Sequence, residues 1–172
     1  AISMTACGGN KSDKSTIRIG SKDFTESLVV AEIYALALED AGYQVERNMN
    51  IAGSVIHTSI TNNEIDLYPE YTGTGLLAIL KMELITDPEV VYQTVKEEYA
   101  KQFNITWLDQ SQANDSNGLV IRTALAKEYG IYTVSDLQKQ ADKIRLASQG
   151  EFEYREDGIP GLEKVYGKFN FK

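Results

Sequence analysis

Hydrophobic positions in the first part of the chain switch from a strand-like to a helix-like spacing. The short run 17–19 predicts a strand that ends at Gly20. Between residues 24 and 38, apolar side chains recur at steps of four and three positions, which places them on one face of a helix. Asp23 is suited to cap the start of this helix, and Gly42 is suited to end it. The pattern therefore predicts a strand that leads directly into a helix.

The alternation of strand and helix continues along the chain. Further strands are predicted over 43–51, 65–68, 105–108, 119–122 and 144–147, and another begins at 169. Helices are predicted over 54–63, after Gly73, from Pro88, over 124–129, from Ser135 and after Pro160, with Asp87 as a strong start signal before Pro88. This order favours an α/β fold with a mostly parallel sheet. Ligands of such sheets bind beyond the carboxyl ends of the strands.

One polar segment interrupts the pattern. Residues 109–117 contain a single apolar side chain. Long polar connections in a compact α/β chain are usually functional or lie between domains. The segment therefore indicates a change of domain, a functional loop, or both.

Composition and charge narrow the possible functions. The chain has 172 residues, one Cys, one His and a net charge of −8. One Cys excludes an internal disulfide framework, and one Cys with one His excludes the common Cys/His zinc sites. The acidic balance argues against a nucleic-acid partner, and no apolar run is long enough to span a bilayer. The sequence contains no recognisable nucleophile–base pair, and we interpret His57 as a surface residue. We therefore expect no enzyme activity, metal or cofactor.

The first residues suggest a membrane anchor. The sequence Met-Thr-Ala-Cys at 4–7 resembles the lipobox of bacterial lipoproteins, in which the Cys is lipid-modified and becomes the new N-terminus. A Gly/Ser/Lys/Asp-rich stretch with the composition of a flexible linker follows it. We predict that Cys7 is lipidated and that the protein lies outside the cytoplasm, tethered to a membrane that it does not span. A stray Cys in a disordered tail is the alternative.

Three loops lie where strands enter helices and carry candidate chemistry. In the loop 20–26, Lys22 and backbone N–H groups could face an anion, or the loop could be a capped turn with a solvated Lys. In the loop 68–75, the Tyr71 ring could hold a cation over its face, or it could pack in the core. In the loop 150–158, Arg155 could clamp a carboxylate, although spacing alone favours pairing with its acidic neighbours.

The three loops together carry a family resemblance. Ile-Gly-Ser-Lys-Asp-Phe-Thr-Glu-Ser at 19–27, Gly-Ser-Val at 53–55 and Tyr-Pro-Glu-Tyr-Thr-Gly-Thr at 68–74 resemble the substrate-binding proteins of osmoprotectant ABC importers. The segment 151–162 also matches, and the likeness extends over most of 16–172. The family's ligands are quaternary amines such as glycine betaine, carnitine and choline.

The resemblance implies a type II periplasmic-binding-protein-like fold with two lobes and a hinge. It divides the chain into a signal-peptide end and tether over 1–15, a first lobe over 16–110 and an incomplete second lobe over 111–172, with the C-terminal part of the fold missing. It also implies that Tyr71 is one wall of an aromatic cage. Lys22 and Thr74 would be polar contacts of the first lobe, and Arg155 a carboxylate partner in the second.

The sequence departs from the family pattern in the polar segment 109–117. A cage Tyr is often found there, after an Asn-x-x step, whereas this chain has Asn114 followed by Asn117 at the expected ring position. We include both as candidate ligand contacts. A missing ring should weaken a simple trimethylammonium cage or make room for a bulkier ligand.

The function implied is that of an extracytoplasmic receptor, lipid-anchored at the outer face of the bacterial cell membrane. It would deliver a quaternary ammonium compound to ABC permease subunits. Two alternatives stay open: a bulkier betaine such as ergothioneine, and a two-lobed sensor domain not linked to transport.

Overall fold

A computed structural model describes residues 16–172 of the chain. It divides into two compact units, the first ending at Glu70 and the second running from Tyr71 to Lys172. The predicted tether and Cys7 lie outside the described residues. The lobe boundary near residue 110 stays a prediction. No helix within 16–172 has both the length and the apolar character that crossing a bilayer requires.

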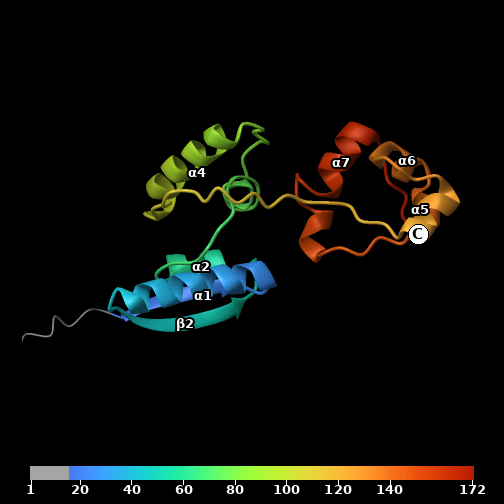
Figure 1. Cartoon of the computed structure of the whole chain (residues 1–172). Coiled ribbons are helices and arrows are strands. Elements are labelled where there is room, and N and C mark those ends of the chain that lie inside the picture. The colour runs from blue at the N-terminus through green and yellow to red at the C-terminus, as the bar shows by residue number, and fades with distance from the viewer. Residues whose placement is uncertain (1–15) are drawn as a thin grey trace, which may run out of the picture. The chain divides into compact units, whose positions relative to one another are not determined.

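The first unit is built on one strand–helix–strand motif. Strand β1 (Thr16–Lys22) pairs in parallel with β2 (Gln44–Ile51), and helix α1 (Thr25–Asp40) connects them. In Figure 1, α1 lies along β2. Leu67 adds a single parallel bridge to Ile19 on the other side of β1. Because β1 is the central strand of this arrangement, its carboxyl end at Lys22 is enclosed by neighbouring segments.

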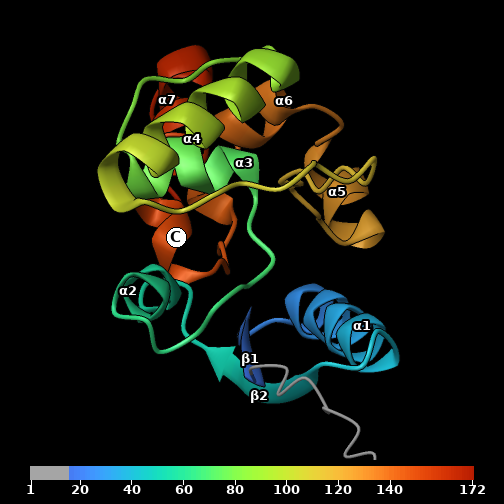
Figure 2. The same cartoon turned by 90° about the vertical axis from the view of Figure 1, so that its left-hand side faces the viewer.

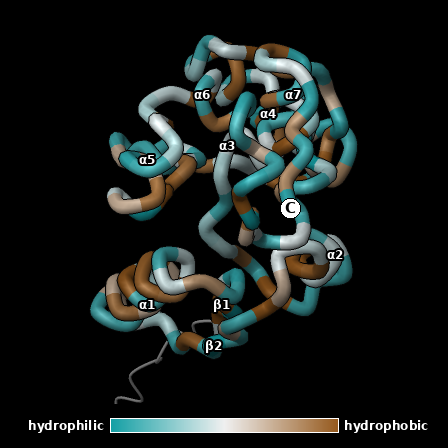
Figure 3. Tube along the Cα trace, turned by 90° about the vertical axis from the view of Figure 1, so that its right-hand side faces the viewer, coloured by the Kyte–Doolittle hydropathy of each residue, from teal (hydrophilic) through white to brown (hydrophobic). Residues whose placement is uncertain are grey.

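Small residues allow α1 to pack closely on β1. Ile19, Ala31 and Ala35 are fully buried and form a cluster between helix and sheet. Helix α2 (Ile56–Thr61) adds the buried Ile56. Figure 3 colours several positions of α1 as hydrophobic, and the apolar side chains of Val29, Ile33 and Leu36 are exposed.

The second unit begins with a short helix and a π-helical turn. Helix α3 (Thr72–Thr74) continues as η1 (Gly75–Ile79), and both lie beside α4 (Pro88–Phe103), as Figure 2 shows. Their core is a cluster of Leu76, Val91, Val95 and Tyr99. The Tyr99 ring meets the rings of Phe103 and Trp107 edge-on, each at a centroid distance of 5.3 Å. A side chain at Gly75 would place its Cβ 2.9 Å from Trp107, so this position needs glycine.

Short helices make up the rest of the second unit. They are α5 (Thr123–Tyr129), α6 (Val134–Lys139), η2 (Ala141–Lys143), η3 (Gly150–Glu153) and α7 (Ile159–Tyr166). Thr133 and Asp136 form a reciprocal capping box at the start of α6. The buried Ala141, Ile144 and Phe169 lie in the segments around α6 and α7.

The helix predictions are confirmed, and most of the later strand predictions are wrong. Asp87 caps α4 as expected, accepting hydrogen bonds from the backbone N–H groups of Glu89 and Val90. Asp23 does not cap α1, since Phe24 occupies the N-cap and provides no side-chain bond. The segment 65–68 makes only an isolated bridge, and within 16–172 no ladder forms at 105–108, 119–122, 144–147 or 169–172. Apolar alternation selects a buried face, whereas a strand also requires a neighbouring backbone to pair with.

Candidate functional site

Lys22 ends β1 with a buried, paired ammonium group. Its Nζ donates a hydrogen bond of 2.5 Å to Oε1 of Glu70, and both side chains are less than a tenth exposed. Its backbone N–H donates to Oγ of the buried Ser27 in α1. The solvated Lys expected for a plain capped turn is therefore wrong. Its role as a ligand contact stays a prediction, and the residue already has an acidic partner.

Glu70 connects Lys22 to two further side chains of the first unit. Tyr68 donates its hydroxyl to Oε2 of Glu70 at 3.0 Å, so the two carboxylate oxygens accept from different groups. Burial lowers the pKa of His57 below its ordinary value, and the Glu70 charge raises it in part. His57 is thus half-buried and within electrostatic reach of Glu70, and its assignment to the surface is wrong. It lies in the first turn of α2, directly after the buried Ile56.

Tyr71 and Thr74 stand at the start of the second unit. Tyr71 has extended backbone geometry at the N-cap of α3, and its side chain is half-buried. Its carbonyl accepts from the N–H of Gly75, which turns the chain into the helix. Thr74 ends α3 and accepts a hydrogen bond on Oγ1 from Nη1 of Arg155 at 3.3 Å. The two predicted site residues Thr74 and Arg155 are therefore in contact.

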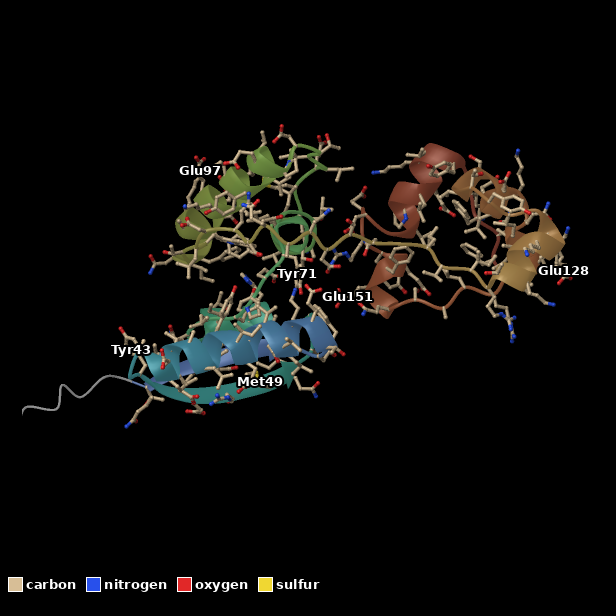
Figure 4. All side chains as sticks on the ribbon, in the orientation of Figure 1. Tyr43, Met49, Tyr71, Glu97, Glu128 and Glu151 are labelled. Atoms are coloured by element: carbon tan, nitrogen blue, oxygen red, sulfur yellow. The ribbon has the colours of Figure 1, made fainter. Side chains whose placement is uncertain are left out.

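Arg155 uses one edge of its guanidinium to hold Asp157. Its Nε donates to Oδ1 and its Nη2 donates to Oδ2, both at 2.8 Å, which is a bidentate pair. Glu151 lies farther away, with Oε2 at 3.9 Å from Nη1. Pairing with acidic neighbours, which spacing alone favoured, is confirmed. Figure 4 labels Glu151 in the segment that leads into this loop and Tyr71 before α3.

Asn117 also reaches Asp157, from 40 positions earlier in the chain. Its Nδ2 donates to the backbone carbonyl of Asp157 at 3.3 Å and to Oδ2 at 3.4 Å. The Arg155 hydrogen bonds, opposed by burial, hold the pKa of Asp157 below its ordinary value, and the Asn117 amide adds to the lowering. Asp157 is the functional candidate that sequence reasoning missed. The signal was present in the Arg-x-Asp spacing, which places a carboxylate two positions after Arg155.

Asn114 lies in the exposed part of the same segment as Asn117. Its Oδ1 is 3.5 Å from Oγ of Ser116, and the structure does not bring it to Arg155 or Asp157. Arg155 and Asn117 thus meet at Asp157, and Arg155 also contacts Thr74, whereas Lys22 belongs to a separate cluster in the first unit. The predicted ligand-binding roles stay predictions for Lys22, Tyr71, Thr74, Asn114, Asn117 and Arg155.

Most tyrosines of the described residues lie at least partly at the surface. Of the ten in the sequence, all within 16–172, Tyr92 and Tyr99 are buried. Tyr132 and Tyr154 are about four-fifths exposed, at 77% and 80%. A tyrosine on an amphipathic helix or loop can present its hydroxyl to water while its ring covers apolar surface. Within 16–172, no cluster of three or more His, Cys, Asp or Glu side chains could hold a metal ion.

The fold belongs to a known class. The structure of apo YehZ from Escherichia coli is 28% identical in sequence and matches with a TM-score of 0.59, covering 92% of this chain and 57% of that one. The likeness and the parallel strand–helix–strand core define an α/β chain of the type II periplasmic-binding-protein class, as the sequence predicted.

The family is shown by a match over residues 15–172 to the "substrate binding domain of ABC-type glycine betaine transport system". The chain belongs to this family. The carnitine transport binding protein OpuCC of Listeria monocytogenes is 33% identical over 170 residues, which cover 96% of this chain and 54% of OpuCC. The ergothioneine transport permease/ergothioneine binding protein EgtU of Helicobacter pylori is 32% identical over 165 residues, which cover 95% of this chain and 29% of EgtU. The chain thus spans about half of OpuCC and less than a third of EgtU.

Proposed function

We propose that the protein is a non-enzymatic receptor for a quaternary ammonium osmoprotectant of the glycine betaine, carnitine or choline type. It captures this ligand outside the cytoplasm and delivers it to the permease subunits of an ABC importer. The observation that carries the proposal is the family match, which extends over 15–172 and includes every described segment with candidate chemistry.

The chemistry of the second unit supports this ligand class. A quaternary ammonium group has no N–H to donate, so ring faces and dispersion contacts are what can hold it. Tyr71 supplies a half-buried ring three positions before Thr74. Thr74 and Arg155 supply a hydroxyl and a guanidinium, which suit the carboxylate of a betaine. The Tyr71 ring would thus contact the cationic end of a zwitterionic ligand. Thr74, three positions later, and Arg155 in the loop 150–158 would contact its carboxylate.

We propose that Cys7 carries a lipid that attaches the protein to the membrane. The lipobox-like sequence at 4–7 and the polar stretch after it support this. Mass spectrometry of the protein from its native host tests the point. A diacylglycerol adduct on Cys7 is expected, and an unmodified Cys7 would contradict anchoring without affecting the ligand proposal.

Calorimetric titration of glycine betaine, carnitine, choline and ergothioneine into the protein as the cell makes it tests the ligand proposal. At least one of the four should bind below millimolar concentration, and no binding would refute the proposal. Tyr71→Ala should lose about 1–3 kcal/mol of binding free energy, which is one cation–π face plus packing. Tyr132→Ala removes an exposed tyrosine from the same unit and is the matched control, so its affinity should equal that of the unmodified protein.

Ergothioneine is the second candidate ligand. It is favoured by Asn117, which stands where the sequence pattern leads us to expect a cage ring, and by the likeness to the Helicobacter pylori ergothioneine-binding protein. A polar amide in place of a ring suits a ligand with a larger, polar head. In the same titration, ergothioneine binding at least tenfold tighter than glycine betaine would select this candidate, and the reverse order would exclude it.

A further inference from the structure

We infer that Asp157 is a positioning residue that sets the orientation of Arg155 and thereby selects for ligands that carry a carboxylate. The inference rests on the proposed function. It comes from the way Asp157 is held between Arg155 and Asn117, two residues from different segments of the second unit.

The first step is the geometry of the guanidinium. Arginine carries five N–H donors in a rigid plane. Asp157 accepts from Nε and Nη2 at 2.8 Å each, which fixes both the plane and the rotation of the group. Nη1 is the remaining nitrogen, and it points to Oγ1 of Thr74. Asp157 therefore turns the Nη1 corner toward Thr74 at the end of α3.

The second step is the support of Asp157 itself. The Asn117 amide donates both to its carboxylate and to its backbone carbonyl, so the polar segment and the Arg155 loop meet at this residue. The loop is also tightly closed. A Cβ on Gly158 would lie 2.0 Å from the backbone oxygen of Phe152, so no larger residue fits without displacing the loop. Asp157 is thus held by its neighbours before any ligand arrives.

The third step is energetic. A free arginine side chain has many rotamers, and ordering it on binding reduces affinity. An arginine already oriented by a carboxylate avoids this cost, and a ligand carboxylate then meets Nη1 and the Thr74 hydroxyl in a prepared position. A ligand without a carboxylate gains nothing from this arrangement. Asp157 should therefore affect binding of glycine betaine and leave binding of choline unchanged.

The test compares both ligands by calorimetry. In Asp157→Asn, the new amide NH₂ would face Nη2 donor to donor, so the bidentate pair is lost with little change of volume. Glycine betaine should bind about tenfold more weakly, the loss expected when one charge-assisted contact is disordered, and choline within about twofold of the unmodified protein. Glu156→Gln is the matched control, since the exposed Glu156 pairs with Lys164, and both affinities should be unchanged.

Two further variants extend the test, and the first of them covers the case in which Asp157→Asn folds poorly. Asp157→Glu keeps the negative charge but shifts the carboxylate by one methylene, so it should weaken glycine betaine by about twofold to threefold without affecting choline. In an Arg155→Lys background, Asp157→Asn should have no further effect on glycine betaine, because its partner is gone.

Equal losses for both ligands, no loss for either, or an undiminished effect of Asp157→Asn in the Arg155→Lys background would overturn the inference. If the unmodified protein binds no quaternary ammonium compound at all, the proposed function itself fails, and the inference fails with it. This second outcome is visible before any variant is made.

Discussion

Lys22 in the first unit and Arg155 in the second are both basic residues predicted to contact ligand, and each is paired with an acid of its own unit. The Lys22 and Glu70 side chains are 6% and 7% exposed. The Arg155 and Asp157 side chains are 21% and 26% exposed, and they meet through two parallel hydrogen bonds. The first pair is a buried contact through one hydrogen bond, and the second is a partly exposed bidentate contact.

The difference in exposure gives the two pairs different roles: the buried pair stabilises the fold, and the partly exposed pair orients a side chain. In a buried ion pair, each charge is stabilised by its partner instead of by water. The loss of either partner therefore leaves an uncompensated buried charge. When a partly exposed pair is broken, water can solvate both of its charges. Such a pair therefore contributes less to the free energy of unfolding. Its planar geometry still defines where the guanidinium points. We therefore expect Glu70 to matter first for folding and Asp157 first for binding.

The largest expected effect is that of Glu70→Ala. It leaves the Lys22 ammonium buried without its carboxylate, so the free energy of unfolding should fall by about 3–5 kcal/mol. Denaturant unfolding followed by circular dichroism measures it. The double variant Lys22→Met/Glu70→Leu should recover most of the loss, because neither charge then remains. Glu64→Ala, an exposed acid of the same unit, is the control. If the free energy of unfolding fell equally in Glu70→Ala and Glu64→Ala, the proposed stabilising role of the buried Lys22–Glu70 pair would be wrong.

A substitution in the loop of the second pair should have the next largest effect. Gly158→Ala forces the loop away from the Phe152 carbonyl, and overpacking of this kind costs about 1–3 kcal/mol. Gly150→Ala is the matched control in the same loop, because its Cβ would meet nothing within 4 Å. Thermal unfolding of both variants checks the prediction. An unchanged midpoint for Gly158→Ala would mean that the loop is not closed around Arg155 and Asp157.

The smallest expected effect is a dependence on pH. Arg155 holds the pKa of Asp157 below its ordinary value, so the pair stabilises the folded protein above that value and stops doing so as pH falls through the lowered one. The unmodified protein should exceed Asp157→Asn in unfolding free energy by less than about 1 kcal/mol near neutral pH. This difference should shrink as the pH falls below the ordinary pKa of an aspartate and vanish below the lowered pKa of Asp157. A difference that grows on acidification would contradict the sign.

Local signals in the sequence predicted the helices well. Asp87 before Pro88 identified the start of α4, because a cap and a first-turn proline act within a few residues. Asp23 misled us, since the chain enters α1 one residue later than its position suggests. The strand predicted at 65–68 reduces to one bridge at Leu67, because pairing depends on a distant backbone that a local pattern does not reveal.

In the candidate site too, contacts between residues close in sequence were predictable, and contacts between distant residues were not. The pairing of Arg155 was predictable, because its acidic partners are two and four residues away. The pairing of Lys22 was not, since Glu70 lies 48 positions later and only the fold brings it to the end of β1. The contact from Asn117 to Asp157 spans 40 positions and was missed for the same reason.

The packing of Trp107 against Gly75 and Tyr99 provides a built-in optical probe. It is the single tryptophan of the sequence, and it is partly buried against the core cluster of the second unit. Its emission therefore reports on that unit alone, whereas the circular dichroism signal includes helices of both. Recorded together on Glu70→Ala, the two signals would show whether melting of the first unit leaves the second intact.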